Sequence, residues 1–172
     1  MTLRYLKSCD SWMACASQGT KGEVGIESAD ERRTLYQYVF YGSIKVAEPF
    51  SDSSKILDGK GGKLIDVKEL KGKNVVFEFL EDTYVWGFNP NVQPRSDSGE
   101  FDASVTDIDW TGRLITENSL KVSKKSILVC LDGSPVVNGK ILSRYNYDEL
   151  STSKTYTIDL KTDGVLALFT QI

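Results

Sequence analysis

Apolar residues in the C-terminal third of the chain occur in short runs that are separated by turn residues. Ile127 to Leu131 is continuously apolar, which predicts a strand buried on both faces. Asp132-Gly133 and Asn138-Gly139 follow it, and both pairs favour the positive φ angles that tight turns require. Pro135-Val136-Val137 lies between the two turns and predicts a short strand. This part of the chain is therefore predicted to be a series of short β-strands.

Three stretches in the first half of the chain show β patterns as well. Thr34 to Val46 is rich in aromatic and β-branched residues, and Lys63 to Lys68 alternates between apolar and polar residues. Asn74 to Phe88 carries two apolar runs separated by Glu81-Asp82-Thr83, which predicts a hairpin. The pattern predicts an all-β protein with antiparallel strands, arranged as a barrel or sandwich.

The strand predicted at Thr34 to Val46 has large apolar side chains on both faces. One face carries Tyr36, Tyr38 and Phe40, and the other carries Leu35, Val39 and Tyr41. A barrel has one interior, so the outward set must meet either the N-terminal segment of its own chain or another chain. We predict a subunit contact at Tyr36, Tyr38 and Phe40, or at the opposite set.

The pattern divides the chain into an N-terminal extension, residues 1–33, and a β domain, residues 34–172. In the extension, Leu3, Leu6, Cys9 and Met13 recur at helical spacing, while polar residues between them equally favour a tail that packs on a neighbouring surface. Residues 89–103 are rich in proline, serine and glycine and predict a linker or an exposed loop within the span assigned to the β domain.

The segment Ile127 to Leu142, ILVCLDGSPVVNGKIL, resembles the centre of a cupin barrel. In that family a strand, an acidic residue with glycine, a short strand and an Asn-Gly-Lys turn follow one another. The resemblance extends over about Gly112 to Ile172, within a cupin-like part at residues 104–172. It implies an antiparallel jelly-roll, cupin-like barrel or sandwich that follows the N-terminal extension.

The resemblance also gives the positions at which cupins hold a metal ion. They fall at Ser119, Lys121, Ser126 and Tyr156, and the chain contains no histidine at all. Transition metals prefer imidazole and carboxylate ligands, so these residue types do not suit a metal site. We expect no metal and no other cofactor.

Composition narrows the possible partners and the compartment. The net charge of −3 argues against nucleic acid as a partner, because such surfaces need clustered lysine and arginine. No apolar stretch is long enough to span a membrane, and the N-terminus lacks the pattern of a secretory signal. The three cysteines are an odd number and predict reduced thiols. We expect a protein made in the cytoplasm, with no membrane partner.

The functional prediction rests on the absence of histidine and on the strand at Thr34 to Val46, which has apolar side chains on both faces. Without histidine, the usual general base of Ser/His/Asp and Cys/His sites is absent, so we expect a protein that is not an enzyme. The leading hypothesis is a non-catalytic structural or assembly protein, a homo-oligomer or a subunit of a larger complex. A phage virion component for decoration, tail or fibre is one such role, by analogy with jelly-roll modules of this size.

The alternative hypothesis is a metal-free, cupin-like module that binds a sugar or another polar small molecule. Its ligand would lie in the barrel interior, against Ser119, Lys121, Tyr147 and Tyr156. The two hypotheses predict different interiors. A polar interior favours ligand binding, and a tightly packed apolar interior favours assembly.

Overall fold

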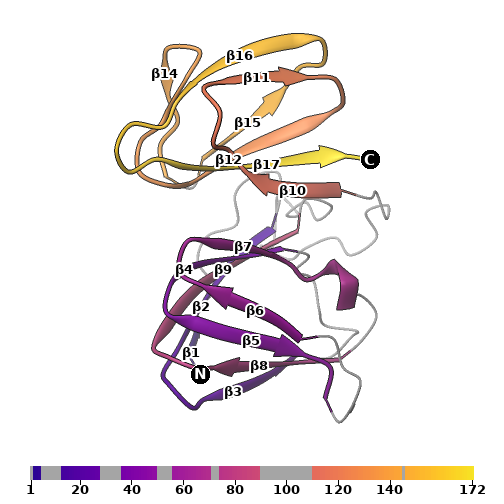
Figure 1. The fold of residues 1–172 in the computed structure, drawn as a ribbon, viewed down its shortest axis with the longest axis vertical. Helices are drawn as coiled ribbons and strands as arrows, with labels where there is room; N and C mark the ends of the chain where they lie inside the picture. Colours follow the sequence, from indigo (N-terminus) through magenta and orange to yellow (C-terminus); the bar gives the residue numbers. More distant parts are fainter. Residues whose placement is uncertain are drawn as a thin grey trace, which may run out of the picture. The chain divides into compact units, whose positions relative to one another are not determined.

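The computed structural model describes residues 2–4, 13–27, 36–49, 56–70, 74–89, 110–144 and 146–172 (Figure 1). The chain separates into two compact units, Met1–Val105 and Thr106–Ile172. This boundary falls inside the span 34–172 that the sequence pattern assigns to a single β domain. Apart from one 3₁₀ turn at Lys68–Leu70, the regular structure of the described residues is β. These residues include no helix of the length and hydropathy needed to cross a bilayer.

The first unit consists of two antiparallel sheets. Its strands are β1 (Thr2–Arg4), β2 (Met13–Gly19), β3 (Val24–Glu27), β4 (Tyr36–Tyr41), β5 (Ser43–Ala47), β6 (Ile56–Lys60), β7 (Lys63–Asp66), β8 (Val75–Phe79) and β9 (Thr83–Asn89). One sheet has the order β1-β2-β9-β4-β7 and the other has the order β3-β8-β5-β6. Consecutive strands of the chain therefore often lie in different sheets.

The second unit also has two antiparallel sheets. Its strands are β10 (Trp110–Leu114), β11 (Ser119–Val122), β12 (Ser126–Asp132), β13 (Val136–Val137), β14 (Lys140–Ile141), β15 (Tyr147–Leu150), β16 (Lys154–Asp159) and β17 (Val165–Gln171). One sheet has the order β10-β17-β12-β15 and the other has the order β11-β16-β13-β14.

The two units share one topology. Adding eight to each strand number of β2-β9-β4-β7 gives β10-β17-β12-β15, and adding eight to β3-β8-β5-β6 gives β11-β16-β13-β14. Eight strands in two packed sheets with this order form a jelly roll. The prediction of an all-β, antiparallel, cupin-like jelly roll is confirmed, and the chain contains this arrangement twice.

Strand register agrees between the units as well. Val39 of β4 lies opposite Val85 of β9, and Cys130 of β12 lies opposite Leu166 of β17. Directly after this pair, the register of β4 and that of β12 each shift by a bulge. A bulge bends a strand and increases its twist, which helps the chain cross from one sheet to the other. The repeat thus extends from strand order to individual residue positions.

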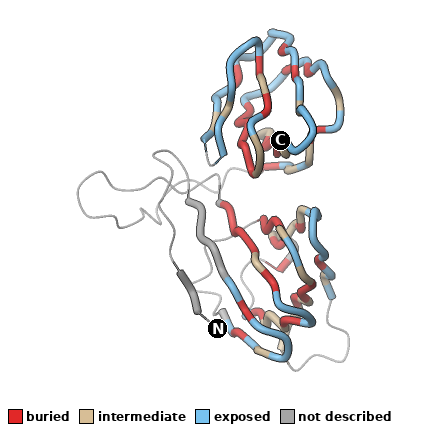
Figure 2. Tube along the Cα trace, turned by 90° about the vertical axis from the view of Figure 1, so that its left-hand side faces the viewer, coloured by how far each residue is buried: buried red, intermediate tan, exposed pale blue. Residues whose placement is uncertain are grey.

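Each unit has its own apolar core (Figure 2). The core of the first unit consists of Val39, Ile44, Val46, Ile65, Val67, Leu70, Val75, Phe79 and Val85. The core of the second unit consists of Ile115, Leu120, Val122, Leu128, Cys130, Val137, Leu150, Tyr156, Ile158, Leu166 and Leu168. At about 25 cal/mol per Å² of buried apolar area, these clusters are the main stabilising contribution in both units.

The turns show where the local predictions hold and where they do not. Asn138 and Gly139 have φ angles of 48° and 77° and join β13 to β14 as a tight hairpin, as predicted. The predicted hairpin between β8 and β9 is wrong, because β8 pairs with β3 and β5 whereas β9 pairs with β2 and β4. Turn residues reveal a reversal of the chain, but they do not reveal whether the next strand joins the same sheet.

The described part of the predicted N-terminal extension is β-structure. Thr2–Arg4 pairs with β2, and Met13–Gly19 pairs along its whole length with β9. Ladder hydrogen bonds to β9 satisfy the backbone of Met13–Gly19, so Met13 is in a strand, while Leu6 and Cys9 of the predicted helical pattern lie outside the described residues. Residues 5–12, and the predicted loop 89–103 apart from Asn89, lie outside the described residues.

Candidate functional site

Two of the four predicted ligand-binding residues lie on the outer face of the second unit. Ser119 and Lys121 are exposed on β11, and they alternate with Leu120 and Val122, which are buried in the core. The prediction that Ser119 and Lys121 line the interior is one residue out of register. A shift of one residue exchanges the two faces of a strand, and here the apolar pair takes the inside.

The other two predicted residues are not gathered around a ligand site either. Tyr156 is buried in the core of the second unit opposite Leu120, and its hydroxyl accepts a hydrogen bond from the Ser151 N–H at 2.8 Å. Tyr147 is half-buried on β15, opposite Val129. The interior of this unit is thus packed by apolar side chains, the outcome that favours assembly over binding of a polar ligand.

Two of the four cupin metal positions, Ser126 and Tyr156, hold residues with structural contacts. Ser126 is buried, and its Oγ donates to the Lys124 carbonyl at 2.9 Å and lies 3.0 Å from the Thr170 hydroxyl. Among the described residues, no group of three or more histidine, cysteine, aspartate or glutamate side chains lies close enough to hold a metal ion.

Cys130 is the one described cysteine whose environment can be judged, and it is not a nucleophile. Burial, and secondarily the Asp132 carboxylate, raise the pKa of its thiol to about 12. The thiol lies fully buried in β12 and donates to the Asp132 carbonyl at 3.3 Å. A thiol that stays protonated and inaccessible cannot attack a substrate at neutral pH.

The predicted interface residues lie in an aromatic layer on β4. Tyr36 and Tyr38 are buried and Phe40 is half-buried, and none of the three belongs to the apolar core of the first unit, whose β4 member is Val39. The Phe40 ring packs edge-on against Tyr38 at 4.9 Å and against Trp86 at 5.6 Å between ring centroids. Tyr36 and Tyr38 are covered within the single chain, which leaves Phe40 as the partly exposed member of this set. The subunit contact predicted there stays a prediction. Leu35, of the opposite set, lies outside the described residues.

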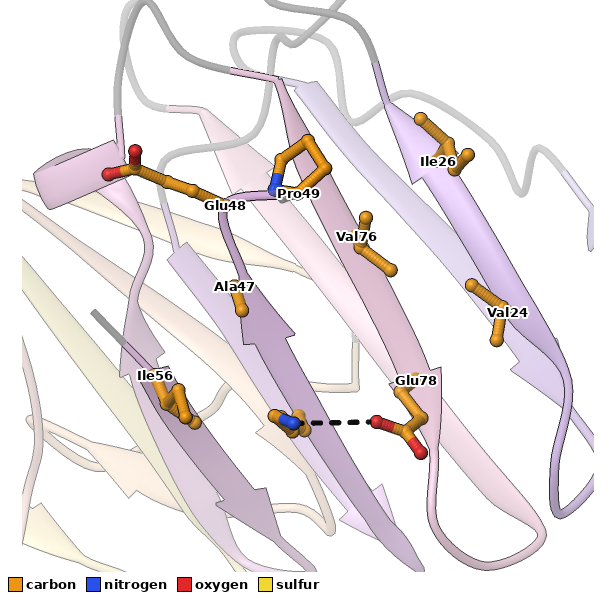
Figure 3. A pocket seen from close by; sticks show the side chains of 9 residues that line it. Val24, Ile26, Ala47, Glu48, Pro49, Ile56, Val76 and Glu78 are labelled. Atoms are coloured by element: carbon orange, nitrogen blue, oxygen red, sulfur yellow. Dashed lines mark ion pairs between the residues drawn. The ribbon is translucent and has the colours of Figure 1, made fainter. Parts of the chain in front are cut away.

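A different surface, which the sequence analysis did not identify, carries Val24, Ile26 and Ile56, the most exposed of the large apolar side chains described in the first unit. It is the outer face of the sheet β3-β8-β5-β6 (Figure 3). Strand register places its side chains in two rows across the four strands. The apolar row consists of Ile26, Val76, Ala47 and Ile56. The mixed row consists of Val24, Glu78, Lys45 and Asp58.

We call these eight residues the outer face of the first unit. Ile26 is 72% exposed, Val24 is 56% exposed and Ile56 is 50% exposed, which is unusual for large apolar side chains. In the mixed row, the Lys45 ammonium and the Glu78 carboxylate form an ion pair at 3.6 Å. A shallow pocket of about 400 Å³ lies over the face, extending to Glu48 and Pro49 at its edge. In the sequence, Val24 and Ile26 alternate with Gly25, and this alternation is the pattern that could have indicated an apolar face on this strand.

The equivalent face of the second unit has a different character. Its strand β11, the counterpart of β3, presents Ser119 and Lys121, and its strand β16, the counterpart of β8, presents Thr155 and Thr157. All four side chains are exposed and polar. The other two strands, β13 and β14, present Val136 and Ile141, of which Ile141 is 67% exposed. The second unit thus has apolar side chains on only two strands of this face, whereas the apolar row of the first unit crosses all four.

Known proteins resemble this chain only distantly. No family model and no curated protein sequence matches the chain. A cupin 2 conserved barrel domain protein from Leptotrichia buccalis is 12% identical, with 99% of this chain and 88% of that chain covered and a TM-score of 0.40. HutD from Pseudomonas fluorescens SBW25 is 12% identical, with 94% and 80% covered and a TM-score of 0.47. A conserved protein of unknown function from Pseudomonas aeruginosa PAO1 is 11% identical, with 94% and 80% covered and a TM-score of 0.49. Similarity at these identities concerns the fold and not the activity.

Proposed function

We propose that the protein is a non-catalytic assembly module, a tandem jelly roll that acts by binding protein chains. It is a homo-oligomer or a subunit of a larger complex. The observation that carries the proposal is the outer face of the first unit, where large apolar side chains are exposed in a row. Exposed apolar patches of a few hundred Å² are often functional, because burying such a patch favours association.

The chemistry of the described residues is consistent with a role that does not involve catalysis. Cys130 is buried and protonated, and the chain has no histidine to serve as a general base. Apart from Gln37 in the first unit, both jelly-roll interiors are packed with apolar side chains, so neither offers the convergent polar groups that orient a small-molecule substrate. The remaining polar groups are spread over strand surfaces and turns.

The small-molecule hypothesis loses its basis in the second unit, since Ser119 and Lys121 point away from the interior. The phage virion role stays a prediction made by analogy. Assembly is the broader class that contains it.

The proposal is tested by the mass of the protein in its native setting. A short peptide tag is added to the chain in cells that normally produce it. The cells are treated with a chemical cross-linker, so that weak complexes survive dilution, and their lysates are fractionated by gel filtration. We expect the tagged protein to elute well above the 19.2 kDa of one chain. The variant Ile26→Ser should move part of it to smaller size. Elution of both proteins at the mass of one chain would contradict an assembly function.

A further inference from the structure

The outer face of the first unit is self-complementary about a two-fold axis. Its four strands are arranged symmetrically around the boundary between the central strands β8 and β5, with β3 and β6 at the edges. We infer that this face docks on the same face of a second copy of the chain, with the axis parallel to the strands and midway between β5 and β8. The inference rests on the assembly function proposed above and specifies its partner.

Charge placement is the first argument for a second copy. Lys45 and Glu78 lie directly opposite one another in the sheet, at the same height along the strands. A two-fold axis between their strands preserves that height and exchanges the strands. Lys45 of each copy then faces Glu78 of its partner, and the two intrachain ion pairs become a four-charge network. Such networks fix the register of a contact.

The apolar side chains complete the match. The rotation places β3 of one copy over β6 of the other, so Ile26 meets Ile56 at both edges of the contact, because these residues lie in the same row. Val76 faces Ala47 near the axis in the same way. Sheets that pack face to face with nearly aligned strands interdigitate their side chains at a spacing of about 10 Å. In the mixed row the same rotation places Val24 over Asp58, so the apolar match is confined to the apolar row.

The size of the face sets the strength of the dimer. Four strands spaced by about 4.8 Å, with two rows of side chains roughly 7 Å apart, present on the order of 300 Å² of sheet surface per copy. Stable complexes bury roughly 800 Å² per partner. We therefore expect a weak, reversible dimer with a dissociation constant on the order of 100 micromolar.

The second unit provides a comparison within the same chain. On β11 and β16 its equivalent face presents serine, threonine and lysine, with the exposed Ile141 at the far edge on β14, and Lys121 there is exposed. The charge change Lys121→Glu therefore serves as a matched control for Lys45→Glu. It alters the same kind of side chain on the same kind of sheet, outside the proposed contact.

Sedimentation velocity of the purified full chain, from about 10 micromolar to about 1 millimolar, measures the association. We expect a monomer–dimer equilibrium in the unmodified protein and in K121E. Ile26→Ser and Ile56→Ser should each weaken dimerisation about tenfold or more. These substitutions replace exposed side chains, and far-ultraviolet circular dichroism checks that the fold is retained.

Charge reversal tests the two-fold axis itself. K45E alone places carboxylates opposite carboxylates, and E78K alone places ammonium groups opposite ammonium groups, so each should stay monomeric. An equimolar mixture of K45E and E78K restores opposite charges across the contact and should dimerise to within about threefold of the unmodified chain. A different partner surface gives no reason for that rescue.

Three results would overturn the inference: a monomer up to about 1 millimolar, a dimer that persists in I26S and K45E, or a mixture of K45E and E78K that stays monomeric. The proposed function is judged separately. A chain that is monomeric when pure but elutes as a large species from native lysates retains the assembly function with a different partner. A chain that dimerises when pure but elutes as a monomer from those lysates loses it.

Discussion

Gly42 and Gly133 occupy the same place in the two units, each at the turn where the chain leaves one sheet and enters the other. Gly42 separates β4 from β5 and has a φ of 81°, and Gly133 follows β12 and has a φ of 69°. A Cβ atom on Gly42 would overlap the Asp82 carbonyl, and one on Gly133 would overlap the Asp163 carbonyl. The backbone thus requires glycine at both places, for its positive φ and for the close approach of a neighbouring turn.

Alanine at either glycine should destabilise its own unit. We expect Gly42→Ala and Gly133→Ala each to lower the free energy of unfolding by roughly 2–4 kcal/mol, since backbone strain and steric overlap add. Gly62→Ala and Gly139→Ala are the controls in the same units, with φ angles of 84° and 77° and no atom within 4 Å of the added Cβ. They should cost only about 1 kcal/mol. Urea unfolding, monitored in each unit by hydrogen exchange, measures the difference in the free energy of unfolding between each glycine variant and its control. Equal losses of stability in the variant and the control of one unit would show that overlap with the neighbouring turn does not matter.

A buried threonine joins the two sheets of the first unit at the same corner. The Thr83 hydroxyl accepts a hydrogen bond from the Ser43 N–H at 2.9 Å, and its own hydrogen points toward the carbonyls of Glu81 at 2.8 Å and Ser43 at 3.1 Å. Thr83 is fully buried, so water cannot replace these bonds. We expect Thr83→Val to cost about 1–3 kcal/mol by leaving the Ser43 N–H unpaired.

Thr83→Ser provides the control for that prediction. Serine keeps the hydroxyl and removes only a methyl group, so it should retain most of the stability. Thermal unfolding monitored by tryptophan fluorescence compares the three proteins. A serine variant as unstable as the valine variant would mean that the methyl group, and not the hydroxyl, holds this corner.

The fold class was predictable from sequence because its signals are local. The apolar run Ile127 to Leu131 and the Asn138-Gly139 turn each determine their structure within a few residues. The duplication was not predictable in this way. Tyr36 to Tyr41 and Ile127 to Asp132 hold equivalent places in the two units, yet no residue type is shared between them position by position. Only the pairing of distant strands shows that these segments correspond.

The candidate sites depended on which face of each strand points inward. Alternation defines two faces, but it does not say which one is covered when both contain apolar or polar residues. On β11 the inside was assigned to Ser119 and Lys121, whereas Leu120 and Val122 take it. On β3 the same ambiguity hid Val24 and Ile26, whose exposure became visible only from the packing of the sheet.

Cys130 makes the stability of the second unit depend on pH in the alkaline range. Burial raises the pKa of its thiol from 9.0 to about 12 in the folded protein. Because the folded pKa is the higher one, the stabilisation is complete below about pH 9. It is lost as pH rises from 9 toward 12, where only the unfolded chain releases the proton. Between pH 8 and 10.5 the unmodified protein should lose roughly 1–2 kcal/mol more than a variant that lacks this thiol.

Cys130→Val is the suitable comparison, because valine is apolar and similar in size and does not titrate. Urea unfolding of both proteins at the two pH values gives the difference, and contributions from Cys9, Cys15, lysine and tyrosine cancel. Parallel stability curves for the two proteins would show that the thiol ionises equally well in the folded and unfolded chains.

The last prediction concerns a polar side chain at a core position of the first unit. Gln37 lies two residues before Val39 on β4 and faces Gly87, while the equivalent Leu128 on β12 faces Leu168. Gln37 is buried, and its side-chain oxygen has no hydrogen-bond partner among the described residues. An unpaired buried oxygen costs free energy that an apolar side chain of the same shape avoids.

Gln37→Met should therefore raise the free energy of unfolding by about 1 kcal/mol, because methionine keeps the length of glutamine and removes the amide. The reciprocal change Leu128→Gln places an amide in the all-apolar layer of the second unit and should cost about 1–3 kcal/mol. The two substitutions would then change the free energy of unfolding in opposite directions at equivalent positions. Because the topology is the same in both units, the difference would come from the side chains that pack around each position. Urea unfolding of the two variants checks the signs. A loss of stability in Q37M would mean that the amide is held by a hydrogen bond that outweighs its burial.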